Sequence, residues 1–294
     1  MPKVTGCITA TFTEAGGQTR LSDRYHAYPL KIAKAFPFDH GQLGVYIMDS
    51  SPGIMGGDEY VLDWRFGENT NVYITNQSYT KVHPARGEGM EASAAQPSRQ
   101  QQKLILQSGS YVEYMPEPLM LYKDAILYTS TEVHMEPSSV LIYSDMVCPG
   151  RTHRGELFHY EKYQNQLTVL YGGEMIYCSR QRVLPAEQKL NALGSWAGYT
   201  HMGSLSVFSD RVDASFVESL RDYIDQWQST AALTQEGPIE PAVPLYYGVS
   251  RTYKYGLVLS VVGHKIYQIQ SLLDEAWQFI RQQLFAKTAL HVRK

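Results

Sequence analysis

Hydrophobic and polar residues alternate along the first two thirds of the chain, as in β-strands that bury one face. Residues 4–13 place Val4, Ile8 and Phe12 on one face, and a Gly-Gly turn leads into a second alternating segment at 19–25. This arrangement predicts a β-hairpin. Further short segments of this type follow at 27–36, 43–48, 60–66, 72–76, 103–107, 111–115, 126–133, 140–146, 158–164 and 167–177.

These segments are separated by glycine, proline, asparagine and aspartate, without an intervening helical period. Strands in direct succession predict a mainly β body, because alternating βαβ units would place a helix after each strand. Residues 85–102 interrupt the series, since they contain few large apolar side chains. We expect a mobile loop there, because this stretch buries too little apolar surface to become ordered.

The C-terminal third contains two amphipathic helical periods. Apolar residues recur along one face of 216–227 and again along one face of 269–284. Ser215 and Glu218 have the spacing of a capping box, which predicts the start of the first helix.

Between the two helices, a proline-rich stretch at 237–244 predicts an extended linker, and 245–262 predicts a hairpin. The second arm of that hairpin, 257–262, is nearly continuously apolar, so we expect a strand buried on both faces. We therefore predict one β-rich domain over 1–294, with 213–294 as a helical and hairpin part packed on it.

Composition narrows the classes of function. The 294 residues include 26 Lys and Arg against 29 Asp and Glu, so the chain lacks the excess of positive charge that nucleic-acid binding requires. The start of the chain does not resemble a secretory signal, and no apolar run approaches the roughly 20 residues of a membrane span. Three cysteines without a CxxC pair fit reduced thiols, so we expect a cytoplasmic protein. The 22 tyrosines suit a partner-binding surface and an ordinary β domain alike.

Motifs of common enzymes are absent from the sequence. It contains no P-loop, no GxGxxG, no HExxH and no GxSxG, and its nine histidines are scattered singly. The carboxylate residues are better candidates for a functional site than the histidines. Asp58 and Glu59 follow two glycines, a pattern typical of a turn or of a paired-acid site for a divalent cation.

Two further stretches combine charge with turn residues. Gly150–Glu156 predicts either a tight loop closed by Arg151 or Arg154 with Asp145 or Glu156, or a polar interior wall or partner contact. In 113–118, a strand runs into an extended Pro-x-Pro step, which we interpret as structural punctuation.

Together, these motifs resemble the urease accessory protein UreD family, called UreH in some organisms. The similar stretches, in order, are Thr19-Arg20-Leu21, Tyr28-Pro29-Leu30-Lys31-Ile32, Pro52-Gly53-Ile54-Met55-Gly56-Gly57-Asp58, Thr75-x-Gln77-x-x-x-Lys81, Glu113-Tyr114-x-Pro116-x-Pro118 and Gly150-Arg151-x-x-x-Gly155-Glu156. The chain departs from the family at Ser260-Val261-Val262-Gly263, where an arginine is frequent, and it lacks the frequent Pro-Arg ending.

This resemblance implies a large solenoid-like or superhelical β body with two α-helices. It implies a non-enzymatic maturation factor that binds accessory protein F, recruits GTPase G through F, and docks on the urease apoprotein. Nickel would pass transiently through an internal passage, without a tightly bound cofactor.

We expect carboxylates along such a passage, because they bind Ni²⁺ more weakly than cysteine and histidine do. The candidate metal residues are Asp58, Glu59, Asp145 and Glu156. Arg251, Tyr253, Tyr255 and Trp227 are candidates for binding F, because arginine and aromatic residues dominate interface hot spots, although core packing explains them equally well. The alternative is a β-sandwich or cupin-like metal-dependent hydrolase whose ligands are brought together by folding.

Overall fold

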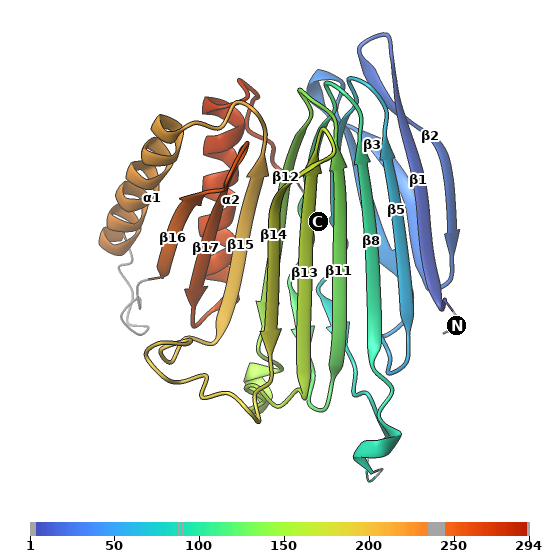
Figure 1. Ribbon diagram of the computed structural model, residues 1–294, viewed down its shortest axis with the longest axis vertical. Coiled ribbons are helices and arrows are strands. Elements are labelled where there is room, and N and C mark those ends of the chain that lie inside the picture. The colour runs from blue at the N-terminus through green and yellow to red at the C-terminus, as the bar shows by residue number, and fades with distance from the viewer. Residues whose placement is uncertain (1–3, 88, 90, 235–244, 293–294) are drawn as a thin grey trace.

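The computed structural model describes residues 4–87, 89, 91–234 and 245–292, and its strands form two large sheets (Figure 1). The first sheet has the spatial order β14-β13-β11-β8-β5-β1-β2. Its strands are β1 (Gly6–Ala15), β2 (Gln18–Ala27), β5 (Glu59–Phe66), β8 (Ser98–Leu106), β11 (Ile126–Met135), β13 (Lys162–Tyr171) and β14 (Glu174–Val183).

The second sheet has the order β16-β17-β15-β12-β9-β6-β4-β3, with β10 pairing between β12 and β7. Its strands are β3 (Leu30–Pro37), β4 (Leu43–Asp49), β6 (Asn71–Asn76), β7 (Thr80–Val82), β9 (Tyr111–Tyr114), β10 (Leu119–Leu121), β12 (Val140–Cys148), β15 (His201–Phe208), β16 (Tyr246–Arg251) and β17 (Gly256–Gly263). The helical segments are η1 (Asp39–Gly41), η2 (Ala92–Ala94), η3 (Thr152–Arg154), α1 (Ala214–Thr234) and α2 (Ile266–Gln283).

In its central part, the chain winds as a coil that adds one strand to each sheet per turn. It passes from β5 to β6, then from β8 to β9, and then from β11 through β12 to β13. Neighbouring strands are parallel within each sheet: β5, β8, β11 and β13 in the first, and β4, β6, β9 and β12 in the second. The prediction of a solenoid-like, mainly β body is therefore confirmed.

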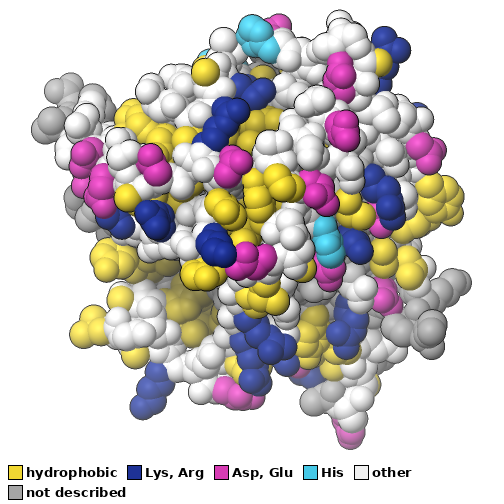
Figure 2. Space-filling model, turned by 45° about the horizontal axis from the view of Figure 1, so that its top comes forward, with side chains coloured by type: hydrophobic (Ala, Val, Ile, Leu, Met, Phe, Trp, Pro, Cys, Tyr) yellow, Lys and Arg dark blue, Asp and Glu magenta, His cyan; other side chains and the backbone are white. Residues whose placement is uncertain are grey.

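The two ends of the coil differ. Short turns join the strands at the upper end in Figure 1, whereas the longer loops 50–58, 149–161 and 184–200 gather at the lower end, together with 83–87 and 91–97. Figure 2 shows the face that carries the short turns, where acidic and basic side chains are interspersed with apolar ones. Among the described residues, no helix combines the length and apolar character that a membrane span needs.

Apolar side chains form two cores. One lies between the sheets and includes Trp64, Leu104 and Phe208. The other lies between the second sheet and the helices, where α2 packs against β15 and β17 and contacts α1. The C-terminal third thus adds a helical layer to the two-sheet body, and both predicted helices are confirmed.

Several local predictions are wrong, each for a physical reason. The stretch 85–102 is not a loop throughout, because its last residues enter β8, where neighbouring strands pair with both edges. The first helix is capped by Asp213, whose Oδ1 accepts a hydrogen bond from the backbone N–H of Phe216 at 2.8 Å, rather than by Ser215. The strand predicted at 158–164 begins only at Lys162.

Other predictions have mixed outcomes. The first hairpin is confirmed as the antiparallel pair β1–β2. The apolar run in β17 is mostly buried, with Ser260 exposed. The proline-rich linker at 237–244 lies outside the described residues.

Candidate functional site: a polar cavity between the sheets

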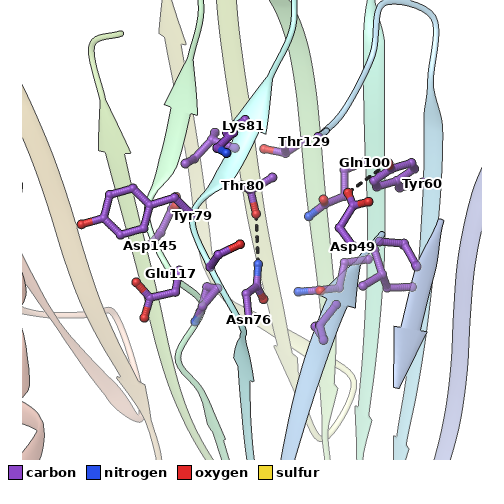
Figure 3. A pocket seen from close by; sticks show the side chains of 18 of the residues that line it. Asp49, Tyr60, Asn76, Tyr79, Thr80, Lys81, Gln100, Glu117, Thr129 and Asp145 are labelled. Carbon is purple, nitrogen blue, oxygen red and sulfur yellow. Dashed lines mark hydrogen bonds between the residues drawn. The ribbon is translucent and has the colours of Figure 1, made fainter. Parts of the chain in front are cut away.

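A polar cavity of about 160 Å³ lies between the two sheets, toward the end that carries the long loops (Figure 3). The first sheet lines it with side chains from β5, β8, β11 and β13, and the second sheet with side chains from β4, β6, β9 and β12. The polar and aromatic residues on these strands are Asp49, Tyr60, Asn76, Gln100, Gln102, Tyr114, Thr129, Thr131, Tyr143, Asp145, Tyr163 and Asn165.

The register of the parallel strands explains why the cavity is polar at one end. Tyr60, Gln100, Thr129 and Asn165 are paired side by side across four strands, and they form one polar row near the strand beginnings. Four residues farther along, the same face carries a row of apolar residues: Trp64, Leu104, Val133 and Val169. Apolar packing therefore fills the end with short turns, and the polar space remains at the opposite end.

Asp145 extends from β12 into the cavity and connects the two sheets. Its Oδ2 accepts a hydrogen bond from Asn165 Nδ2 at 2.6 Å, and Asn165 Oδ1 accepts one from Thr129 Oγ1 at 2.7 Å. Burial raises the pKa of Asp145 from 3.8 to about 6. At neutral pH this carboxylate is mostly ionised, and its oxygens are available as weak ligands.

Two other carboxylates line the cavity near its mouth. Asp49 accepts hydrogen bonds from the Tyr60 hydroxyl at 3.2 Å and from Ser51. Burial raises the pKa of Tyr60, so this phenol stays neutral and remains a donor. Glu117 accepts a hydrogen bond from Gln270 Nε2 at 3.4 Å, which joins the mouth to α2.

Of the four predicted metal residues, only Asp145 lines this cavity. Asp58 closes a turn, since its Oδ2 accepts the Met55 N–H at 2.8 Å. Glu59 is buried one residue before the inward-facing Tyr60, so the alternation of β5 directs it to the other face of the sheet. The turn interpretation of Gly56–Glu59 therefore agrees with the local contacts, and a metal role for Asp58 and Glu59 stays a prediction.

Glu156 is held within its own loop. Arg151 donates to both carboxylate oxygens, with Nε at 2.8 Å from Oε2, and its guanidinium lies 4.5 Å from the centre of the Tyr122 ring. The hydrogen bond from Arg151 is the main cause that lowers the pKa of Glu156. Of the pairings left open by the sequence, the structure forms the one between Arg151 and Glu156, and it closes the loop.

The four predicted partner residues do not form one surface. Arg251, Tyr253 and Tyr255 are exposed around the turn between β16 and β17, and the Tyr255 ring lies 4.8 Å from that of Tyr171. Trp227 is half-buried in the core between the helices and the second sheet. It lies about 20 Å along α1 from the start of the helix, at 1.5 Å per residue. Core packing therefore accounts for Trp227, while the turn residues remain available to a partner.

Two glutamines of the cavity were not predicted from the sequence. Gln100 and Gln102 belong to a stretch interpreted as a loop, although Leu104 and Leu106 continue their alternation on the same face.

Across the described residues, no group of three or more His, Cys, Asp and Glu side chains is placed to hold a metal ion. The convergent ligand set required by the hydrolase alternative is therefore not found in this part of the chain.

Comparisons with known proteins find the same family along most or all of the chain. The sequence model of a family described as UreD urease accessory protein matches residues 4–294. A urease accessory protein UreD from Acetivibrio thermocellus is 30% identical over 258 residues, which are 87% of this chain and 90% of that protein. A UreD from Bacillus sp. (strain TB-90) is 26% identical over 99% of both chains. A protein named UreD 2 from Streptomyces griseus is 32% identical over 75% of each.

Proposed function

Because this chain belongs to the UreD urease accessory protein family, we propose that it is a urease maturation factor in the cytoplasm. It binds accessory protein F, recruits GTPase G through F to the urease apoprotein, and assists the delivery of nickel. In this proposal the protein has no catalytic role and holds no tightly bound cofactor, and nickel occupies it only in transit.

The polar cavity between the sheets is the observation that supports the nickel step. Its walls supply carboxylate, amide and hydroxyl oxygens, and no cysteine or histidine is among the described residues that line it. Oxygen donors bind Ni²⁺ more weakly than thiolates and imidazoles, so an ion enters and leaves such a space readily. Asp145 is the residue that we assign to this passage, because it is the predicted carboxylate that faces the cavity.

The nickel step is tested by Asp145→Asn, which keeps the shape of the side chain but removes its charge and replaces one acceptor oxygen by an NH2 donor. We expect urease matured with this variant to contain less nickel by metal analysis, while F still co-purifies with the variant. Glu156→Gln is the matched control, because Glu156 is held outside the cavity by Arg151. A full complement of nickel in urease from the Asp145→Asn strain would contradict the proposal. The double change of Asp58 and Glu59 to Ala tests the turn carboxylates by the same measurement of nickel in urease.

The exposed turn between β16 and β17 is the surface that we assign to F. Tyr253 is 75% exposed, and Arg251, two residues before it, is exposed as well. The double change Arg251→Ala and Tyr253→Ala should weaken co-purification with F. Tyr267→Ala is the control, because Tyr267 is a comparably exposed tyrosine on α2. Undiminished recovery of F with the double variant would exclude this surface.

A further inference from the structure

The outer face of the first sheet carries no covering layer. Among the described residues, α1 and α2 pack on the second sheet, and Figure 1 shows both helices beside β16 and β17. Side chains of β8, β11, β13 and β14 that point away from the cavity therefore face solvent, and their chemistry decides what this surface can bind.

One register row on this face runs across four strands. From β8 to β14 it consists of Arg99, Tyr128, Gln164 and Arg182. The residues that follow the first three line the cavity, so the alternation of the strands directs this row outward. At a strand spacing of about 4.8 Å, the Cα atoms of the two arginines that end the row lie roughly 14 Å apart.

Two further basic residues extend this row. Lys162 lies two residues before Gln164 in β13, and Arg180 lies two residues before Arg182 in β14, so both share the outward face. The three arginines are exposed, and Lys162 is half-buried. We call Arg99, Lys162, Arg180 and Arg182 the basic patch.

Nearby carboxylates do not neutralise the basic patch. In the described part of the chain, the salt bridges involve other basic residues. Glu59 of β5 continues the row beyond Arg99, and the patch keeps an excess of positive charge even with this carboxylate counted. Farther along the strands, Asp63 and Glu132 are already bonded to basic residues of their own strands.

Tyr128 holds two of these cations close together. The Arg99 guanidinium carbon lies 4.8 Å from the centre of the Tyr128 ring, and Lys162 Nζ lies 4.7 Å from it. The ring attracts both cations, but the two like charges repel each other at this range. A carboxylate supplied from outside would relieve that repulsion, so the pair is suited to an acidic ligand.

Protection of the sheet edge explains only part of the patch. β14 is an edge strand, where Arg180 and Arg182 discourage pairing with another chain. Arg99 and Lys162 lie in β8 and β13, which have neighbouring strands on both sides. Their charges need another explanation, because an interior strand presents no free edge.

We propose that the basic patch docks on an acidic surface of the urease apoprotein. The inference rests on the proposed function, in which F binds the β16–β17 turn and G is recruited through F, so the apoprotein is the partner left for this face. Guanidinium groups bind carboxylates through two parallel hydrogen bonds, which suits a sheet face that presents three arginines. Nucleic acid is the less suitable ligand, because the chain as a whole has a net charge of -3.

The test reverses two charges of the patch, Arg99→Glu and Arg182→Glu, in the full-length protein. Binding of purified urease apoprotein to the immobilised wild type and variant is measured at low and at high salt. We expect the variant to bind the apoprotein at least about tenfold more weakly at low salt, with a smaller difference at high salt, because salt screens charges at an exposed interface. Binding of F should stay unchanged.

Two further variants serve as controls. Lys31→Glu with Lys103→Glu makes the same change in net charge at exposed positions outside the patch, in β3 and β8, and should bind the apoprotein like the wild type. Arg99→Lys with Arg182→Lys keeps the positive charges and should bind much more tightly than the reversed variant. If the reversed variant does not fold, as judged by circular dichroism, Arg99→Gln with Arg182→Gln replaces it and should still weaken binding.

Equal affinities of the wild type and the reversed variant for the apoprotein overturn this docking surface, and so does an equal loss in the control with Lys31 and Lys103 reversed. Loss of F instead of the apoprotein, or tighter binding of a short DNA duplex than of the apoprotein, overturns it as well. If the wild type binds neither F nor the apoprotein, the proposed function itself fails. If it binds both and charge reversal changes neither, the proposed function stands without this surface.

Discussion

The carboxylate of Glu113 and the guanidinium of Arg281 form an ion pair that is almost completely removed from solvent. Glu113, in β9, is 0% exposed, and Arg281, near the end of α2, is 4% exposed. The Trp277 indole donates to Glu113 Oε1 at 2.9 Å, and Gln42 Nε2 donates to Oε2 at 2.7 Å. The pair fixes α2 to the centre of the second sheet, in the motif that the sequence analysis interpreted as punctuation.

Breaking this pair from one side should destabilise the fold strongly. Glu113→Gln leaves Arg281 buried without a countercharge, so we expect a loss of about 3–5 kcal/mol in the free energy of unfolding. The double change Glu113→Leu and Arg281→Met should recover most of that loss. Chemical denaturation followed by tryptophan fluorescence measures both. Glu174→Gln, in the exposed pair with Lys254, is the control and should have little effect. If the double variant loses as much free energy of unfolding as the two single changes added together, this prediction is contradicted.

Asp145 should make stability depend on pH in an unusual direction for a carboxylate. Its pKa is raised to about 6 in the folded protein, so the unfolded chain releases this proton at lower pH than the folded one. The contribution of Asp145 to stability is therefore largest below about pH 4, falls between pH 4 and 6, and stays low above pH 6. Tyr143 and Tyr163, which face the same space, remain neutral in this range because burial raises their pKa values.

Asp145→Asn removes this penalty. At pH 7.5 we expect the variant to be more stable than the wild type by about 1–2 kcal/mol, allowing for the polar walls of the cavity. The difference should vanish as the pH falls toward 4. Denaturant titrations at several pH values measure it, and a difference that does not change with pH would show that Asp145 titrates normally.

The start of α1 offers a comparison between two neighbouring caps. Asp213→Ala removes the acceptor for the Phe216 N–H, so the midpoint of thermal unfolding should fall measurably. Ser215→Ala should change it much less, because the Ser215 hydroxyl only donates to Asp213. Hydrogen bonds from Phe216 and Ser215 lower the pKa of Asp213. Its contribution to stability should therefore be lost as the pH falls below the pKa of an ordinary aspartate. Equal effects of the two substitutions would favour the predicted capping box instead.

Two glycines flank the loop that Arg151 and Glu156 close. A Cβ at Gly150, where φ is +140°, would lie 2.5 Å from the carbonyl oxygen of Glu156, whereas a Cβ at Gly155 meets nothing within 4 Å. Gly150→Ala should therefore cost roughly 1–3 kcal/mol, and Gly155→Ala only about 1 kcal/mol from its left-handed φ. Denaturation of the two variants side by side provides the measurement, and a larger loss at Gly155 would contradict this account of the loop.

Local patterns predicted those elements whose partners lie close in the chain. The β1–β2 hairpin and both helices follow from alternation and periodicity over about ten residues. Pairing within the coil was not accessible in this way, because Tyr60 meets Gln100 only after an entire turn of chain. The cavity depends on that register, which explains why Asp145 was identified as a carboxylate of interest while the glutamines opposite it were assigned to a loop.

The parallel coil also has a consequence for how the protein acquires its structure. Each strand of the central sheets pairs with one that arrives only after the next circuit is complete, and Glu113 waits for Arg281 near the end of the chain. Contacts at such large sequence separation make folding slow, because the entropy of closing each loop is lost before the pairing stabilises it. We therefore expect refolding to proceed over seconds or longer, and newly synthesised chains to need protection from aggregation until the last helix is in place.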